Sequence, residues 1–430
     1  MEIQCNFRAA VSLPAGSVVA SLPLVNSSNL VESMSIFLSS PLRAIRFLLA
    51  LMCIVALGNA AAAAIDSSGD NRVASIARLL AGVAPSNSAH FDLAQTPEWR
   101  EHRDLIQAGW AKVKQGRESS MVHWRDQTIR SACTGSGTLL YPFSGPDFAN
   151  AHILFPGCKN YILFGLELPG QVPELEKLDR SAFGRLLVDV RAAVGDLVER
   201  NYFITSHMSR QLHTSQLRGV VPVIIASMAL AGLEVRSVES FALPRTADPA
   251  TSVEPPGPKP IRKLRAVRIT YQRPGSGQIQ TVQYFSVDAT NTGLAPYPEF
   301  LDHLKSAKPA AMLLKSASYL LQDRQFRVIR DTLLEAAELL VQDDTGMPYA
   351  VLKASGWDMQ LFGEYRKPIK PFHWAYQRGL DGAYKTAQPR ELPFSFSYHW
   401  RGGKSNAMIA RRASVQAAVP GTAVKNMATR

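Results

Sequence analysis

The residues whose types and spacing could support chemistry gather in one strand–turn–helix–strand unit. Its parts are a buried strand at Thr138–Phe143, a tight turn at Ser144–Asp147, a short helix at Phe148–Phe155 and a second strand at Asn160–Glu167. Gly145 stands in the turn, and Glu167 ends the second strand 22 residues later. Glycine lets a ligand approach the backbone, a helix N-terminus favours an anion, and a carboxylate accepts hydrogen bonds from ribose hydroxyls. This unit is typical of the opening of a nucleotide-binding α/β sheet.

The turn departs from the dinucleotide fingerprint, because it holds one glycine followed by proline where the fingerprint has three glycines. It is closer to the methyltransferase-like branch of such folds, whose first loop varies more. The ligand-binding residues predicted here are Ser144, Gly145, Asp147 and Glu167. In the alternative interpretation Asp147 caps its helix, Glu167 makes a surface ion pair and the unit binds nothing.

Other sequence patterns give no catalytic residue, metal or cofactor. Ser144 lacks the G-x-S-x-G elbow of hydrolases, because Pro142 stands where the first glycine belongs. His207 and His213 are six residues apart, which places them on different faces of a helix and does not suit a zinc pair. We therefore predict no cofactor and no metal, and the catalytic residues stay unassigned.

The N-terminal region predicts export. Phe47–Leu57 is a run of eleven apolar residues, with Arg43 and Arg46 before it and the small residues Gly58–Ala64 after it. A positive region, an apolar stretch of this length and a small-residue exit are the three parts of a secretory signal peptide. The predicted location is the periplasm or the outside of the cell, with membrane contact only during export.

The start of the chain and the fate of the signal are separate predictions. Cleavage is expected after Ala62 or Ala64, and translation from Met34, where a signal of normal length begins. An uncleaved membrane anchor is the alternative, because Phe47–Ile65 approaches the roughly 20 residues that cross a bilayer.

Cysteine usage agrees with export. Cys5 and Cys53 fall in the part that is removed with the signal, so Cys133 and Cys158 remain. Two cysteines allow one pairing, and an oxidising compartment favours it. A disulfide is predicted, with two buried thiols as the alternative.

Helices and strands interleave along the rest of the chain. The predicted helices are Asn71–Gly82, Thr96–Lys114, Arg180–Tyr202 and Phe326–Val341, with a very apolar element at Val220–Leu233. The predicted strands are Glu234–Ser240, Met312–Leu321 and a hairpin of Ala266–Tyr271 with Ile279–Val287. This order predicts an α/β fold: a mixed or mostly parallel sheet with flanking helices, a Rossmann-like opening unit and a β-hairpin.

The chain divides by composition into four parts. Residues 1–64 hold an N-terminal extension and the signal, and residues 65–246 a helical lead-in and the α/β core. The proline-rich stretch 247–263 is predicted to be a loop, and residues 264–430 complete the same α/β body with the hairpin and an aromatic-rich C-terminal region.

The formal net charge is +12. This charge suits weak attraction to anionic envelope surfaces or acidic substrates. It does not indicate nucleic-acid binding, because the lysines and arginines are scattered and form no stripe with interleaved aromatic residues.

The sequence also resembles a known group of proteins. The run Tyr141–Phe148 (YPFSGPDF) with Tyr161–Gly170 after it, and the later segments Ser318–Leu321, Gln342–Tyr349 and Leu361–Tyr365, are similar to an uncharacterised family of bacterial proteins that often carry export signals. The resemblance covers most of residues 120–400. It implies a single co-extensive domain and transfers no catalytic residue.

Two functions remain open. The first is a periplasmic or envelope-associated protein that binds an unknown small-molecule or envelope ligand in a cleft lined by Ser144–Asp147, Glu167 and C-terminal aromatic residues. The second is an enzyme on a degenerate, methyltransferase-like core that acts on a polar small molecule or an envelope substrate. Asp147 and Glu167 would then act as acid and base if they converge across a pocket.

Overall fold

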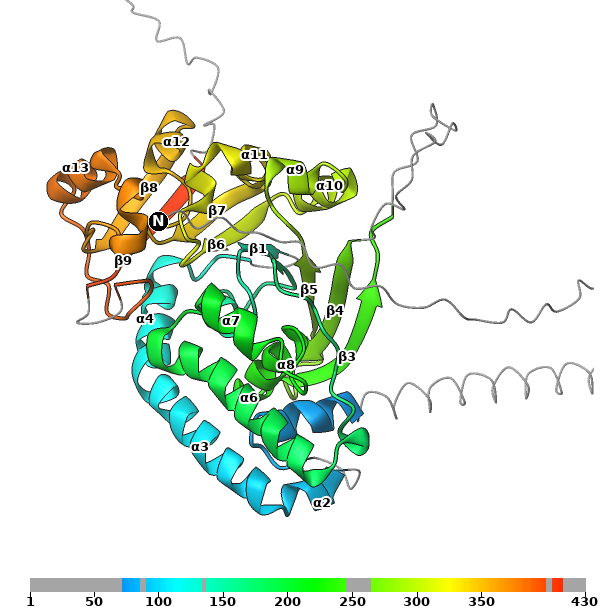
Figure 1. Ribbon diagram of the computed structural model, residues 1–430. Coiled ribbons are helices and arrows are strands. Elements are labelled where there is room, and N and C mark those ends of the chain that lie inside the picture. Colours follow the sequence, from blue (N-terminus) through cyan, green and yellow to red (C-terminus); the bar gives the residue numbers. More distant parts are fainter. Residues whose placement is uncertain (1–71, 86–89, 134–136, 245–263, 400–403, 413–430) are drawn as a thin grey trace, which may run out of the picture. The chain divides into compact units, whose positions relative to one another are not determined.

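Nine strands form one sheet in the computed structural model, and helices cover both of its faces (Figure 1). The structure describes residues 72–85, 90–133, 137–244, 264–399 and 404–412. All of these belong to one compact unit, Asp66–Arg430. The predicted signal sequence and the predicted proline-rich loop at 247–263 lie outside the described residues.

The sheet is mixed, with a parallel centre. Its strands are β1 (Thr138–Pro142), β2 (Asn160–Gly165), β3 (Glu234–Phe241), β4 (Arg265–Gln272), β5 (Ile279–Ser286), β6 (Ala310–Leu314), β7 (Ala337–Gln342), β8 (Trp357–Gly363) and β9 (Asn406–Arg412). They lie in the order β3-β4-β5-β2-β1-β6-β7-β9-β8. The five central strands, from β5 to β7, are parallel, whereas β4 and β9 run antiparallel to their neighbours.

The central order is that of a doubly wound, Rossmann-like sheet. The chain passes from β1 to its neighbour β2, continues to the outermost strand β3, returns through β4 to β5 beside β2, and then crosses back to place β6 on the other side of β1. The direction of winding therefore reverses between β1 and β6, and in such sheets ligands bind outside the carboxyl ends of the strands at this switch point. The predicted fold class, with its opening unit and its hairpin of β4 and β5, is confirmed.

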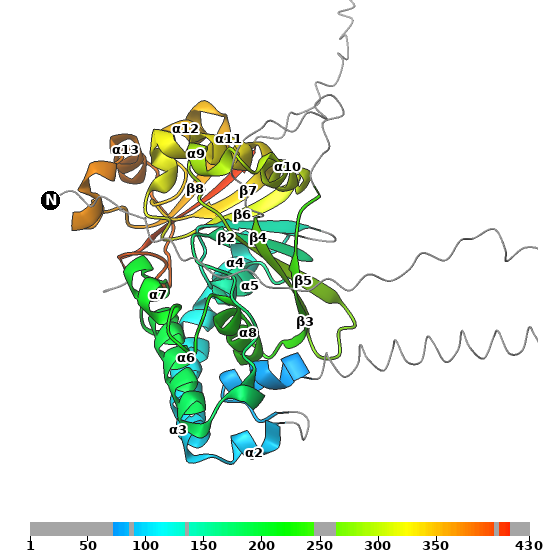
Figure 2. The same ribbon diagram turned by 45° about the vertical axis from the view of Figure 1, so that its right-hand side comes forward.

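Alternating side chains of the strands build two cores. In β1, Leu139 and Tyr141 face one hydrophobic cluster and Leu140 faces the other. The first cluster packs under α3 (Pro97–Val113), α4 (Ser119–Thr128), α5 (Phe148–Leu154), α6 (Arg180–Arg200) and α8 (Val221–Leu230). The second packs under α10 (Pro298–Ser306), α11 (Arg327–Ala336), α12 (Tyr349–Ala354) and α13 (Arg378–Thr386). Figure 2 shows the two helix layers on opposite sides of the strands.

Short helices complete the chain. They are α2 (Phe91–Ala94), α7 (Thr205–Gln211), α9 (Asn291–Leu294), the π-helical η4 (Lys114–Glu118) and the 3-10 turns η5 (Leu175–Lys177), η6 (Leu320–Gln322), η7 (Arg324–Phe326) and η8 (Lys370–Ala375). Within the described residues, no helix is long and apolar enough to cross a membrane.

One predicted helix is wrong over its last five residues. The helix expected at Phe326–Val341 ends at Ala336, and the chain continues directly as strand β7. Helix-forming residues fill this stretch, so local propensity favours one long helix. The space between β6 and β9 requires a strand, and burial of Leu340 and Val341 on opposite faces of the sheet outweighs that propensity. The strand expected at Met312–Leu321 likewise ends early, at Leu314.

The predicted disulfide is confirmed. Cys133 and Cys158 are bonded, with their Cα atoms 4.6 Å apart. Cys133 lies shortly before β1 and Cys158 shortly before β2, so the bond joins the chain at the amino ends of the two strands of the opening unit. The carboxyl ends of the same strands, at the opposite edge of the sheet, carry the polar residues described next.

Candidate functional site

The turn after β1 folds tightly against the next strand. The backbone N–H of Ser144 donates to the carbonyl of Phe164 at the end of β2 (3.2 Å), and Gly145 adopts a positive φ of 50°. Asp147 then caps α5, because its Oδ1 accepts from the backbone N–H of Asn150 (3.2 Å). Ser144 and Asp147 are both buried, so the turn presents little side-chain surface to a ligand.

A buried ion pair links this turn to β6. Nζ of Lys315, the residue that follows β6, lies 3.1 Å from Oδ2 of Asp147, and both side chains are at most 3% exposed. The same carboxylate accepts from the hydroxyl of Tyr141 (2.8 Å) and the side-chain amide of Asn150 (2.9 Å). Lys315 also donates to the backbone carbonyl of Asn201. The ion pair therefore joins the segments that follow β1 and β6, at the switch point of the sheet.

Burial sets the electrostatics of this cluster. It lowers the pKa of Lys315, although the neighbouring Asp147 carboxylate acts in the opposite direction. Burial also lowers the pKa of Arg117, a residue of the π-helical segment η4, to about 10. The pKa of Tyr141 rises because of its burial and the nearby Asp147 charge. The Asp147 carboxylate thus contacts side chains of its own chain, as a buried carboxylate does when it stabilises a fold.

The turn after β7 holds a second buried polar cluster. Asp343 accepts from the backbone N–H groups of Ser316 and Thr345, both at 2.8 Å. Asp344 accepts from the hydroxyl of Tyr319 (2.6 Å) and the side-chain amide of Asn406 (2.8 Å). Burial and the charge of Asp343 raise the pKa of Asp344 to about 7. Among the described residues, no group of histidine, cysteine and acidic side chains could hold a metal ion.

The loop between β6 and η6 is strained. Ser316, Ser318 and Tyr319 have positive φ values of 53°, 53° and 59°, which side-chain-bearing residues rarely adopt. The Tyr398 hydroxyl holds the loop, since it donates to the Ser316 carbonyl (2.9 Å) and lies 2.8 Å from the Ser318 hydroxyl. Backbone strain of this kind persists only where the surroundings enforce it, and it concentrates at functional positions.

Glu167 lies beyond the end of β2 and is half-buried. Its Oε2 is 3.5 Å from the hydroxyl of Tyr284, which also donates to its carbonyl (3.1 Å). Burial raises the pKa of Glu167. The structure brings this carboxylate close to Gly145, since a Cβ placed there would be 3.9 Å from Oε2. Gly145 and Glu167, two of the predicted ligand-binding residues, therefore lie close together.

The approach to Gly145 is already filled. A Cβ on Gly145 would lie 2.8 Å from Sδ of Met208, a buried residue of α7. The Met208 side chain therefore lies against the Gly145 backbone, the part of such a turn that a nucleotide approaches. Ser144 makes no hydrogen bond with a described histidine; its hydroxyl donates to the Gly145 carbonyl (3.1 Å).

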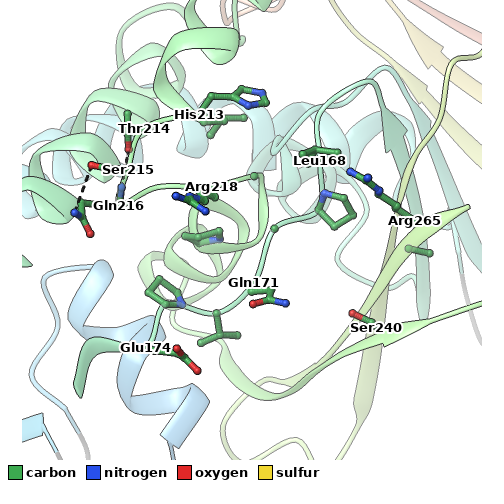
Figure 3. A pocket seen from close by; sticks show the side chains of 18 of the residues that line it. Leu168, Gln171, Glu174, His213, Thr214, Ser215, Gln216, Arg218, Ser240 and Arg265 are labelled. Atoms are coloured by element: carbon green, nitrogen blue, oxygen red, sulfur yellow. Dashed lines mark hydrogen bonds between the residues drawn. The ribbon is translucent and has the colours of Figure 1, made fainter. Parts of the chain in front are cut away.

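An open cleft of about 930 Å³ begins immediately after Glu167 (Figure 3). Three segments of the carboxyl edge line it: residues 168–178 after β2, residues 212–219 between α7 and α8, and the adjoining ends of β3 and β4. The cleft is therefore at the carboxyl edge of the sheet, beside β2, β3 and β4 and away from the switch point between β1 and β6. None of the four predicted site residues is among those that line it.

The two loop walls of the cleft are joined by their backbones. The N–H groups of Val220 and Val221 donate to the carbonyls of Leu168 (3.0 Å) and Pro169 (2.9 Å). At the crossing, a Cβ on Gly170 would lie 1.8 Å from the Arg218 carbonyl, and φ of Gly170 is +71°. Only glycine allows this approach, and the resulting walls are fixed relative to each other.

Two arginines give the cleft its charge. Glu174 and Lys177, which also line it, pair with each other at 2.7 Å. Arg218 and Arg265 are exposed, and among the described residues neither guanidinium has a hydrogen-bond or ion-pair partner. Figure 3 shows Arg218 near the middle of the cleft and Arg265 on the side of β4. Neither was predicted as a site residue: Arg218 lies in the loop between α7 and α8, whereas Arg265 begins β4, 47 residues later, and ends the basic run Lys259–Arg265, which is interpreted from the sequence as a solvated linker.

Comparison of the chain with known protein families, curated proteins and solved structures found no match.

Proposed function

We propose that this protein is exported and binds an anionic small molecule in the cleft at the carboxyl edge of its sheet. One observation carries the proposal: Arg218 and Arg265 face one rigid cleft without an acidic partner among the described residues. A guanidinium presents paired N–H donors that match a carboxylate or a phosphate in two parallel hydrogen bonds. The ligand would therefore carry at least one such group.

The rest of the cleft suits a small molecule. Its volume lies within the roughly 300–1,000 Å³ of ordinary ligand sites. Apolar residues such as Leu168, Val172 and Pro222 provide most of the remaining lining, with a few polar groups between them. This combination of apolar walls and few placed polar groups is the usual composition of a binding pocket.

Export is supported by the disulfide together with the N-terminal sequence pattern. Disulfides persist in oxidising compartments, and Cys133–Cys158 is the pairing expected there. The test is the intact mass of the protein purified from its native host, before and after reduction. A chain that begins at residue 63 or 65 and gains about 2 Da on reduction supports the proposal. A chain that begins at Met1 or Met34 with free thiols contradicts it.

Ligand binding is tested with three anions: D-galacturonate, citrate and inorganic phosphate, with uncharged D-galactose as the counterpart of the first. Titration calorimetry should detect at least one anion and no galactose. Loss of a charge-assisted contact costs about 1.5–3 kcal/mol, so Arg218→Gln and Arg265→Gln should each weaken binding about tenfold or more. Arg273→Gln is the matched control, because it removes a charge from the opposite end of β4. Unchanged binding by the double variant, or no binding of any anion, would refute the proposal.

A second candidate is an enzyme on a degenerate, methyltransferase-like core. It is favoured by the doubly wound strand order and by the half-buried Glu167 beside Gly145. Met208 opposes it by covering the Gly145 backbone. Calorimetry with S-adenosylmethionine distinguishes the two, since the cleft proposal expects no binding by the wild type. Binding that strengthens in Met208→Ala would favour the second candidate.

A further inference from the structure

A second cavity adjoins the cleft. It has a volume of about 780 Å³ and lies between α3 and α6. Thr214 and Ser215, in the loop between α7 and α8, line both cavities. Figure 3 shows Ser215 at the end of the cleft opposite Arg265. The two hollows therefore share this loop as a border, and a ligand that crosses the loop contacts both, from the β4 side of the carboxyl edge to the surface of α3 and α6.

The loop at the junction is firmly held. The Thr214 hydroxyl donates to Asp189 on α6 (2.6 Å) and accepts from the backbone N–H of Leu217 (2.8 Å). An isolated β-bridge joins His213 to Arg218 across the loop. The loop that borders both cavities is therefore held in one conformation, and its Thr214 is hydrogen-bonded to α6, which lines the second cavity.

The second cavity is charged but balanced. Its lining holds three arginines and three acidic residues: Arg180, Arg185, Arg191, Glu98, Glu101 and Asp189. The charges are largely paired within the protein, with Arg180 2.9 Å from Glu98 and Arg191 3.7 Å from Glu101. Such a surface offers donors and acceptors together without attracting a charged group of either sign. The first cavity, in contrast, carries Arg218 and Arg265, which have no charged partner in the described part of the chain.

We infer that the natural ligand is a short, chain-like oligosaccharide whose carboxylate lies at Arg218 and Arg265 and whose neutral sugar units extend through the second cavity. The inference rests on the proposed anion binding in the cleft and adds its ligand class. Each cavity alone matches the size of an ordinary ligand site, so a compact molecule fills one of them and a chain is needed for both.

The chemistry of the second cavity favours sugar over peptide. A sugar hydroxyl both donates and accepts, so adjacent carboxylates and guanidinium groups satisfy it from either side. Peptide grooves hold apolar side chains in pockets or add a strand to a sheet edge. Here the walls are two helices, and Val188 is the one lining residue with a purely apolar side chain.

The experiment titrates the mature protein with D-galacturonate and with galacto-oligosaccharides of two to six units that end in a single galacturonate. Affinity should rise about tenfold or more from the monomer to a length that spans both cavities, and then level off. Val188→Trp, which narrows the second cavity, and Arg185→Ala, which also lies only in that cavity, should remove the gain with length and leave monomer binding intact. Val188→Ala and Arg273→Gln are the controls and should retain the gain.

The outcomes separate the two proposals. Monomer binding without any gain in affinity for longer oligomers overturns the chain-like ligand and leaves the anion cleft standing. If neither the monomer nor any oligomer binds, the cleft proposal and this inference are both refuted. Neutral maltooligosaccharides that bind as well as the acidic series overturn the role of the two arginines. Oligoglutamates that show the length dependence, when the acidic sugars do not, identify the two cavities as a peptide site.

Discussion

Replacing Lys315 tests how much the fold depends on the ion pair at its switch point. Lys315→Met keeps the aliphatic bulk of the side chain but leaves the buried Asp147 carboxylate without its countercharge. Removing one partner of a buried pair costs about 3–5 kcal/mol. Asp147 retains its hydrogen bonds from Tyr141 and Asn150, which lowers this cost, whereas the Asn201 carbonyl loses a donor, which adds about 1 kcal/mol. We expect a loss of about 4 kcal/mol in the free energy of unfolding.

The assay is urea denaturation followed by tryptophan fluorescence, with the loss taken from the shift in the transition midpoint. Lys305→Met is the control, because the Lys305–Glu335 pair is solvent-exposed and its removal should change stability by less than about 0.5 kcal/mol. Adding Asp147→Asn to Lys315→Met removes the unpaired charge and keeps a capping side chain, so it should recover at least half of the loss. A loss below about 1 kcal/mol in Lys315→Met, or additive losses in the double variant, would refute the reasoning.

Three further predictions concern other parts of the structure. Replacing both Cys133 and Cys158 by serine should cost about 3 kcal/mol in thermal or urea unfolding, because the bond closes a 25-residue loop in the unfolded chain; an unchanged melting temperature would contradict this. Asp344 has a folded-state pKa raised to about 7, so its contribution to stability is fully present below its unfolded value and is lost as pH rises through 7. Asp344→Asn should make the melting temperature less dependent on pH between about pH 4 and about pH 7, and an unaltered pH dependence would count against this raised pKa. Gly170→Ala should lose anion binding and destabilise the protein by more than Gly275→Ala, which has a similar positive φ and no neighbouring atom; equal effects would disprove the role of the close approach.

The sequence predicts the opening unit well because its signals are local. The apolar runs of β1 and β2 and the helix cap at Asp147 depend on neighbours within a few residues, and all three occur where expected. The passage from α11 to β7 was missed because it depends on the space between two other strands. Helix-forming residues around Ala337 carry no local signal for that constraint.

The site was harder to predict because its residues, too, are brought together from distant parts of the sequence. Asp147 and Lys315 are 168 residues apart, and nothing in either segment indicates that the two strands are neighbours. Gly145 and Glu167, in contrast, lie close together because the β-α-β unit fixes their relation. Arg218 and Arg265 line the same cleft only because of the fold, so no spacing rule could select them among the 47 lysines and arginines of the chain.

The backbone crossing at Gly170 has a consequence for binding kinetics. Because the Val220 and Val221 hydrogen bonds fix the cleft walls before any ligand arrives, little loop ordering has to accompany association. Encounter is then limited by diffusion and by attraction of the anion to a chain of net charge +12, a contribution that salt weakens. Differences in affinity among related ligands should accordingly appear in their residence times, while their association rates stay similar.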